Sequence, residues 1–116
     1  MRYAIEPMGA PRMTRADAWK RRPVVLRYRA FKDACREAGV QVPESGARLT
    51  FVLPMPPSWS QRRRASMDGQ PHRSKPDIDN LVKATLDAIY DDDAAVWDIS
   101  ARKVWGQSGE IIVEVA

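Results

Sequence analysis

The sequence predicts a small α+β domain in which two main helices pack on one face of a mixed or antiparallel sheet. The chain has 116 residues, the length of a single domain. Hydrophobic residues make up 44% of the chain, enough for one modest core. Segments with strand and helix periodicity follow in the order β, α, β, α, β, β, which is typical of the α+β class. We therefore expect residues 1–116 to form one domain, which would gain stability from oligomerisation.

The first half of the chain predicts two strands and a helix between them. Residues 2–6 alternate in character, as a short strand does. Residues 24–38 carry apolar side chains three and four positions apart, which is the period of an α-helix, and Gly39 is a natural stop. Residues 48–53 read as a β-rich strand that Pro54 ends.

The second half predicts one helix followed by two strands. The helix covers residues 79–90. The strands at 99–105 and 111–115 flank a turn that contains glycine. We therefore expect these two strands to pair as a hairpin.

Two segments, at about 7–23 and 56–76, are rich in proline and basic residues and are predicted to be long loops. Loops of this length in a small domain are usually functional or disordered. Trp19 and Trp59 within them would stack on nucleic-acid bases or, as we expect more strongly, pack back onto the domain. The residues expected to contact phosphates are Arg12, Arg15, Lys20, Arg21, Arg22, Arg62, Arg63, Arg64, Arg73 and Lys75.

Charge is unevenly distributed along the chain. Before Asp77 there are 16 Lys and Arg against 6 Asp and Glu, and from Asp77 onwards there are 3 against 9. A basic part joined to an acidic part is typical of a protein that binds a polyanion and holds cations at one place. Two ordinary solvated surfaces would give the same charge distribution.

The number of cysteines and the hydropathy of the chain indicate in which cellular compartment the protein is expected. A single cysteine, Cys35, forms no internal disulfide, and its place on the apolar face of a helix predicts a core position. No apolar run is long enough to cross a bilayer, and the first residues do not resemble a secretory signal. We expect a cytoplasmic protein that does not contact membranes.

The run PDIDNLVK gathers charged groups at the start of the second helix. Asp79 is expected to be the N-cap, with Asp77 in extended chain before it. Side chains two apart in extended chain point the same way, and Lys83 lies one helical turn beyond Asp79. Two carboxylates and an ammonium can therefore face one point. The plain alternative is that Asp79 only caps the helix and Lys83 makes an exposed ion pair.

A second acidic cluster, Asp91 to Asp93, follows the same helix. Consecutive carboxylates at the negative end of a helix repel one another, and a bound cation such as Mg²⁺ would relieve that cost. A solvated turn that ends the helix is the alternative. Because the two clusters flank opposite ends of the helix, they meet only if the chain doubles back or a homodimer brings them together.

The run KPDIDNLVKATLDAI, followed by DDDAAV, resembles the signature of the RusA-type Holliday junction resolvases, which are crossover junction endodeoxyribonucleases common in phages and prophages. The segments GAPRMTRADAWKRRP and LPMPPSWSQRRRASMDGQPHRSKPDIDN resemble phage-type members, so the resemblance covers most of the chain. It implies a homodimer with a mixed α/β fold. The implied activity is Mg²⁺-dependent resolution of four-way DNA junctions, with Mn²⁺ as an alternative ion and no small-molecule cofactor.

The resemblance also implies a role for each matching residue. Asp77 and Asp79 match two metal-binding aspartates, and Lys83 matches a catalytic lysine. Asp93 matches the third essential aspartate. The link between helix and Asp-Asp is shorter here than in many members, which leaves Asp92 as an alternative third ligand and Asp91 as a further, less favoured one. The implied catalytic set is therefore Asp77, Asp79, Lys83 and Asp93.

Two other functions fit the same residues. A nuclease for flaps, nicks or forks would use the same acidic site on another branched DNA. A non-catalytic DNA-binding protein would keep the aspartates for structural reasons. His72, the one histidine, has no partner motif and is expected at the surface or near a phosphate.

Overall fold

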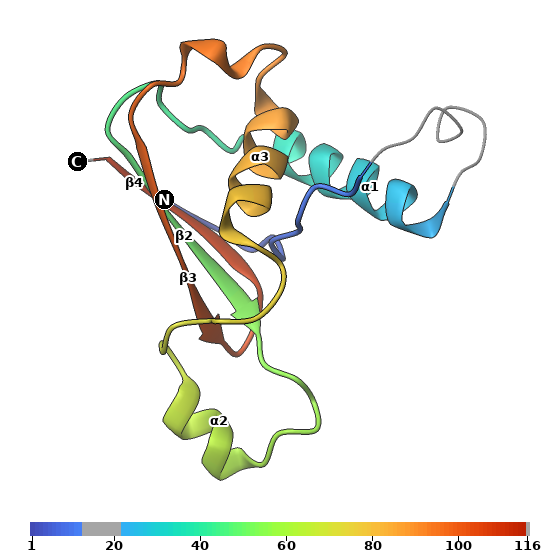
Figure 1. Cartoon of the computed structure of the whole chain (residues 1–116), viewed down its shortest axis with the longest axis vertical. Coiled ribbons are helices and arrows are strands. Elements are labelled where there is room, and N and C mark those ends of the chain that lie inside the picture. Colours follow the sequence, from blue (N-terminus) through green and yellow to red (C-terminus); the bar gives the residue numbers. More distant parts are fainter. Residues whose placement is uncertain (13–21, 116) are drawn as a thin grey trace.

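A computed structural model describes residues 1–12 and 22–115. Within these residues three α-helices and a four-stranded mixed sheet confirm the α+β class (Figure 1). No described helix has the length and apolar character needed to span a membrane. The elements in chain order are β1 (Arg2–Tyr3), α1 (Pro23–Glu37), β2 (Ala47–Pro54), α2 (Gln61–Met67), α3 (Ile78–Ile89), the 3-10 helix η2 (Asp93–Ala95), β3 (Ile99–Gly106) and β4 (Glu110–Val115).

The sheet has the strand order β1-β4-β2-β3. β2 pairs in parallel with β3 and antiparallel with β4, so it lies between them and the expected hairpin of residues 99–105 with 111–115 is wrong. The central place falls to β2 because it is the most continuously buried strand. Residues 107–109 cross the end of β2, a distance of about 10 Å that a short link can span.

The core lies between one face of the sheet and the helices α1 and α3. Leu49 and Phe51 of β2 point to this face and are almost fully buried. Phe31 of α1 and Leu81 of α3 meet them in the same cluster. Cys35 is also in this cluster, as expected, and burial raises the pKa of its thiol to about 11.

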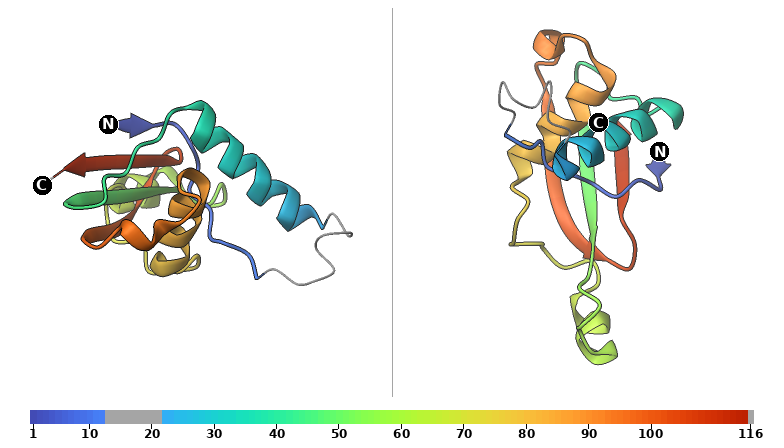
Figure 2. Two further views of the ribbon diagram at one scale, coloured as in Figure 1. Left: turned by 90° about the horizontal axis from the view of Figure 1, so that it is seen from above. Right: turned by 90° about the vertical axis from the view of Figure 1, so that its right-hand side faces the viewer.

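The segment at 56–76 is not the continuous loop that was expected, because it contains α2. Ser60 caps this helix, its hydroxyl accepting a hydrogen bond from the Arg63 amide at 3.2 Å. None of the residues of α2 is buried, so the apolar periodicity that reveals a helix in sequence is absent. Figures 1 and 2 show α2 beyond the end of the long strands, away from α1.

Residues 7–12, which we call the N-terminal arm, pass beside the start of α3. The Ala10 amide donates to the Asn80 carbonyl at 3.3 Å. Gly9 lies close to Pro76, since a Cβ at Gly9 would be only 3.1 Å from the Cβ of Pro76. The remainder of the expected loop at 7–23 falls largely on residues 13–21, outside the described part of the chain.

The close approach of β3 to β2 at Gly106 yields a stability prediction. A Cβ at Gly106 would lie 2.2 Å from Cγ1 of Val52, so Gly106→Ala overpacks the sheet. We expect it to lower the free energy of unfolding by about 1–3 kcal/mol, measured by urea denaturation. The double variant Gly106→Ala/Val52→Ala removes the clashing methyl and should lose less than the sum of the single losses. Strict additivity would contradict the contact.

Candidate acidic site at the start of α3

The acidic pair lies where the chain enters α3. Asp77 is the N-cap residue: its backbone is extended, and its carbonyl accepts the first helical hydrogen bond from the Leu81 amide at 3.1 Å. Asp79 lies inside the first turn, so the expectation that Asp79 caps the helix is wrong. The cap is set by this backbone bond, which a residue pattern does not reveal. The Asp77 carboxylate caps no amide of the helix, and both aspartates are exposed.

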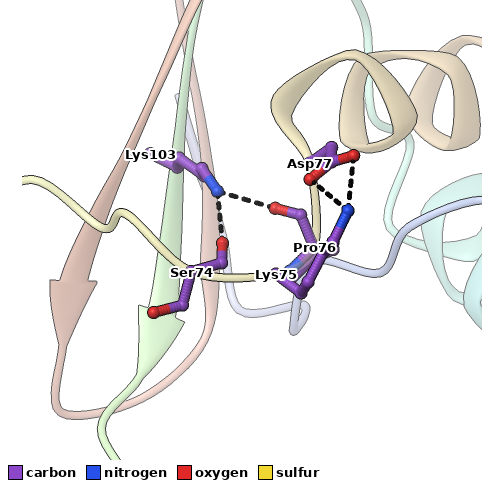
Figure 3. A network of polar contacts seen from close by, with 5 residues as sticks. All are labelled: Ser74, Lys75, Pro76, Asp77 and Lys103. Atoms are coloured by element: carbon purple, nitrogen blue, oxygen red, sulfur yellow. Dashed lines mark hydrogen bonds and ion pairs between the residues drawn. The ribbon is translucent and has the colours of Figure 1, made fainter.

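A lysine ammonium neutralises one carboxylate of the pair. Lys75 Nζ donates to both carboxylate oxygens of Asp77 at 2.9 Å (Figure 3). These hydrogen bonds lower the pKa of Asp77 and raise the pKa of Lys75. The Lys75 side chain is 84% exposed, so the pair adds little stability and stays open to a competing cation. Lys75, expected to bind DNA, lies on the acidic site in this structure.

A second lysine, Lys103 of β3, holds the backbone just before the pair. Its ammonium donates to the carbonyl oxygens of Ser74 and Pro76, the latter at 2.7 Å (Figure 3). Lys103 pairs with Phe51 in the parallel register, so its side chain leaves the sheet on the face that the helices cover.

Sequence reasoning missed Lys103, although its strand carries a signal. Ile99, Ala101, Lys103 and Trp105 alternate along β3 and therefore share one face. A charged residue among apolar neighbours on a core-facing side must find polar partners. Here those partners are backbone carbonyls from a segment that sequence alone does not place beside β3.

Residues 69–76, which we call the strap, run along the outer edge of β3 and lead into α3. The Gly69 amide donates to the Trp105 carbonyl at 2.9 Å, and the His72 amide donates to the Lys103 carbonyl at 3.1 Å. The strap thereby pairs part of an edge strand that would otherwise be open.

His72 is buried within the strap, not at the surface as expected. Its side chain is packed against Trp105, with ring centroids 4.0 Å apart, and Nδ1 accepts from the Ser74 amide at 3.4 Å. Burial, followed by the nearby charge of Lys103, lowers the pKa of His72. The imidazole is therefore neutral at pH 7, which allows it to lie in an apolar contact.

Aromatic packing joins the α2 end of the molecule to the sheet. The rings of Trp59 and Trp105 lie 4.8 Å apart, and the Arg63 guanidinium lies 4.0 Å above the Trp59 ring. Trp59 thus packs on the domain, the more favoured of its two expected roles. Trp19 lies outside the described residues.

Lys83 pairs with a carboxylate further along α3 and not with Asp79. Its ammonium lies 3.6 Å from Asp87, which also accepts a hydrogen bond from the Tyr28 hydroxyl at 3.1 Å. Burial and the Asp87 charge raise the pKa of Tyr28 to about 12. Lys83 is therefore on the same helix as the acidic pair, but its ion pair is with Asp87 on the next turn.

Asp91 to Asp93 lie beyond the opposite end of α3. The twelve residues of α3 span about 18 Å, so this cluster is remote from Asp77 and Asp79. Asp92 caps η2 by accepting from the Ala94 amide at 2.9 Å. The described residues of one chain contain no group of three or more His, Cys, Asp or Glu side chains that could hold a metal ion.

The basic residues divide into exposed and structural ones. Arg62 and Arg73 are exposed. Arg64 donates to two backbone carbonyls of the turn before α2, at 2.8 and 3.3 Å. Arg22 donates to the Arg12 carbonyl at 3.2 Å, which joins the N-terminal arm to the start of α1. Outside the described residues lie Arg15, Lys20 and Arg21.

Fold and site together define a class of protein. A small α+β domain presents two exposed carboxylates at a helix start, beside the N-terminal arm and a strap that carry exposed basic residues. Carboxylates suit hard divalent cations, and exposed arginines suit DNA phosphates. This combination is typical of nucleases that hydrolyse a DNA backbone.

The family comparison agrees with this class. The family model described as endodeoxyribonuclease RusA matches residues 5–116, which is nearly the whole chain. The protein therefore belongs to the RusA family of endodeoxyribonucleases, as the sequence resemblance indicated. The comparison with curated proteins and the comparison with solved structures each gave no match.

The buried His72 yields a prediction for pH dependence. Its pKa in the folded state lies below its ordinary value of 6.5, so the unfolded chain binds a proton that the folded chain does not. The free energy of unfolding should therefore fall as pH decreases below about 6.5, while it is insensitive to this group above that pH. Urea denaturation between pH 7.5 and 5 measures the slope.

Because the chain has one histidine, its NMR titration gives the folded pKa directly. The variant His72→Gln serves as control and should lose the slope between pH 6.5 and 5. A folded pKa at or above 6.5 would contradict the buried neutral imidazole.

Proposed function

We propose that the protein is a metal-dependent, structure-selective endonuclease that resolves four-way DNA junctions in recombination and repair by paired hydrolysis of phosphodiester bonds. Family membership supports hydrolysis of DNA. The observation that carries the site is the exposed pair Asp77 and Asp79 at the start of α3, with basic surface beside it.

Mg²⁺, with Mn²⁺ as the alternative, fits the donor set. Hard divalent ions prefer carboxylate oxygens and keep several waters, so they need few protein ligands. The Lys75 ammonium on both oxygens of Asp77 supports a cation site at that carboxylate. Lys75 must leave Asp77 when a metal binds, and is then free to contact a phosphate. The bound ion would supply an activated water and neutralise phosphate charge.

The described residues of one chain do not bring three carboxylates together, so we propose a homodimer. A two-fold dimer places the same surface of each copy against the other, and can bring Asp93 of one copy beside Asp77 and Asp79 of the second. The remoteness of the two clusters along α3 supports this arrangement. Two symmetric sites would also suit the paired cuts that a four-way junction requires.

Asp93 suits the third ligand position better than Asp92. The Asp92 carboxylate is engaged with the Ala94 amide as the cap of η2. Asp93 is exposed, and in the described part of the chain its carboxylate has no hydrogen bond or ion pair. An uncommitted carboxylate can reorient toward a shared ion without breaking a local contact.

Lys83 is proposed to stabilise the negative charge that develops on the phosphate during hydrolysis. Its side chain is 64% exposed, and its contact with Asp87 is a long one. The Tyr28 hydroxyl donates to the same carboxylate, so Asp87 keeps a hydrogen-bond partner when Lys83 turns to the substrate. Because Asp87 keeps the hydrogen bond from Tyr28, the free-energy cost of breaking its contact with Lys83 is small.

Cleavage of a synthetic four-way junction tests the site assignment. With Mg²⁺ or Mn²⁺, Asp79→Asn should reduce the rate by about 100-fold or more, because loss of a metal ligand removes several kcal/mol of charge stabilisation. Asp33→Asn changes an exposed aspartate on α1 and is the matched control. Undiminished cleavage by Asp79→Asn would rule out the site. Flap and fork substrates, assayed in parallel, test the preference for junctions.

Mixing two inactive variants tests whether the site is shared between copies. A mixed dimer of Asp79→Asn with Asp93→Asn contains one site with every aspartate intact, so it should regain nicking of one strand. A mixture of Asp79→Asn with Asp77→Asn has no intact site and should remain inactive. Failure of the first mixture to regain activity, with subunit exchange verified, would place all the required carboxylates within one chain.

A further inference from the structure

We propose that Lys103 is a positioning residue for the acidic pair: its ammonium binds the carbonyl oxygens of Ser74 and Pro76 and so fixes the backbone from which Asp77 and Asp79 project. This inference rests on the function proposed above, because it takes the two aspartates to be cation ligands. It concerns a residue on a different element, β3, which touches neither carboxylate through a hydrogen bond.

The pairing of the strap with β3 shows why such an anchor is needed. Backbone bonds join the two segments from Gly69 to His72. Beyond His72 the strap leaves the edge of β3, and among the described residues the next hydrogen bonds from the sheet to the strap are those of the Lys103 side chain. The segment that immediately precedes the aspartates is thus held to the sheet by one ammonium (Figure 3).

The anchor itself is held rigidly. Lys103 lies in a continuous parallel ladder opposite the fully buried Phe51, and its carbonyl accepts the His72 amide. Its side chain is partly buried on the core-facing side of the strand, which limits the directions in which the ammonium can point. An ammonium offers three donors, enough for two carbonyls of the same turn.

The two lysines beside the site have opposite expected effects on cation binding. Lys75 binds the Asp77 carboxylate directly, so it competes with an incoming metal ion. The Lys103 ammonium binds backbone carbonyls and not the carboxylates. By fixing the backbone it should strengthen metal binding, whereas its positive charge alone would weaken it. If Lys103 acts as an anchor, removing it should weaken metal binding. If it acts only through its positive charge, removing it should strengthen metal binding, as is expected for Lys75.

Titration of the full-length, metal-free protein with Mn²⁺, followed by the electron paramagnetic resonance signal of the free ion, tests the proposal without an activity assay. Removing a group that orients metal ligands typically costs about 10- to 100-fold in affinity, and we expect Lys103→Met to weaken Mn²⁺ binding by that amount. Lys103→Arg keeps the charge and the donors and should restore most of the affinity. Lys75→Met should bind Mn²⁺ more tightly than the wild type.

Unfolding midpoints are measured for each variant, and if Lys103→Met does not fold, Lys103→Gln carries the same expectation of weaker binding. Unchanged or tighter binding by the Lys103 variant would overturn the inference, because Lys103 would then act only as a charge. Asp79→Asn is included to separate the two proposals. If Asp79→Asn binds Mn²⁺ as the wild type does, the metal site itself is wrong; if it loses binding while the Lys103 variant keeps it, only the role of Lys103 fails.

Discussion

The burial of β2 between β3 and β4 is the constraint on which the rest of the structure depends. Because β2 is covered on both edges and packed on its helix side, its register sets the positions of both neighbours. The position of β3 in turn determines where the strap pairs with it, and the strap leads directly into α3. The acidic pair is thus placed by a core strand from which it is separated by more than twenty residues of sequence.

The rigidity of α3 is the reason why we propose that a second copy completes the site. A helix packed along its buried residues Leu81, Ala84 and Ala88 does not bend enough to bring its two ends together. The same packing that stabilises the fold therefore keeps the two acidic clusters apart within one chain. This separation also avoids the repulsion that five aspartates would suffer at one metal-free site.

Sequence reasoning predicted the α+β class, the two main helices and the family, because these follow from apolar periodicity and an ordered run of charged residues. It failed where tertiary contacts decide. The pairing of β3 and β4 was misassigned because a short link can cross the end of a third strand as readily as close a hairpin. The helix α2 was missed because none of its residues is buried. His72 was placed at the surface because Trp105, the ring against which it packs, lies far along the chain.

Sequence spacing suggested which residues form the candidate site, but it did not predict their contacts. Spacing alone singled out Asp77, Asp79 and Lys83 as a group, yet it could not show that Lys75 occupies Asp77 or that Lys83 turns to Asp87. Lys103 was overlooked since its partners are backbone atoms, which carry no residue-specific signal.

The absence of buried residues in α2 has an evolutionary consequence. Apart from Arg64, which binds the turn before the helix, its positions contribute little to stability, so mutations there are less restricted than those in β2 and α3. The Trp59 side chain, which packs on Trp105, joins this end of the molecule to the sheet. Substitutions on the surface of α2 can therefore change the charge of this end of the molecule at less cost in stability than substitutions in β2 or α3.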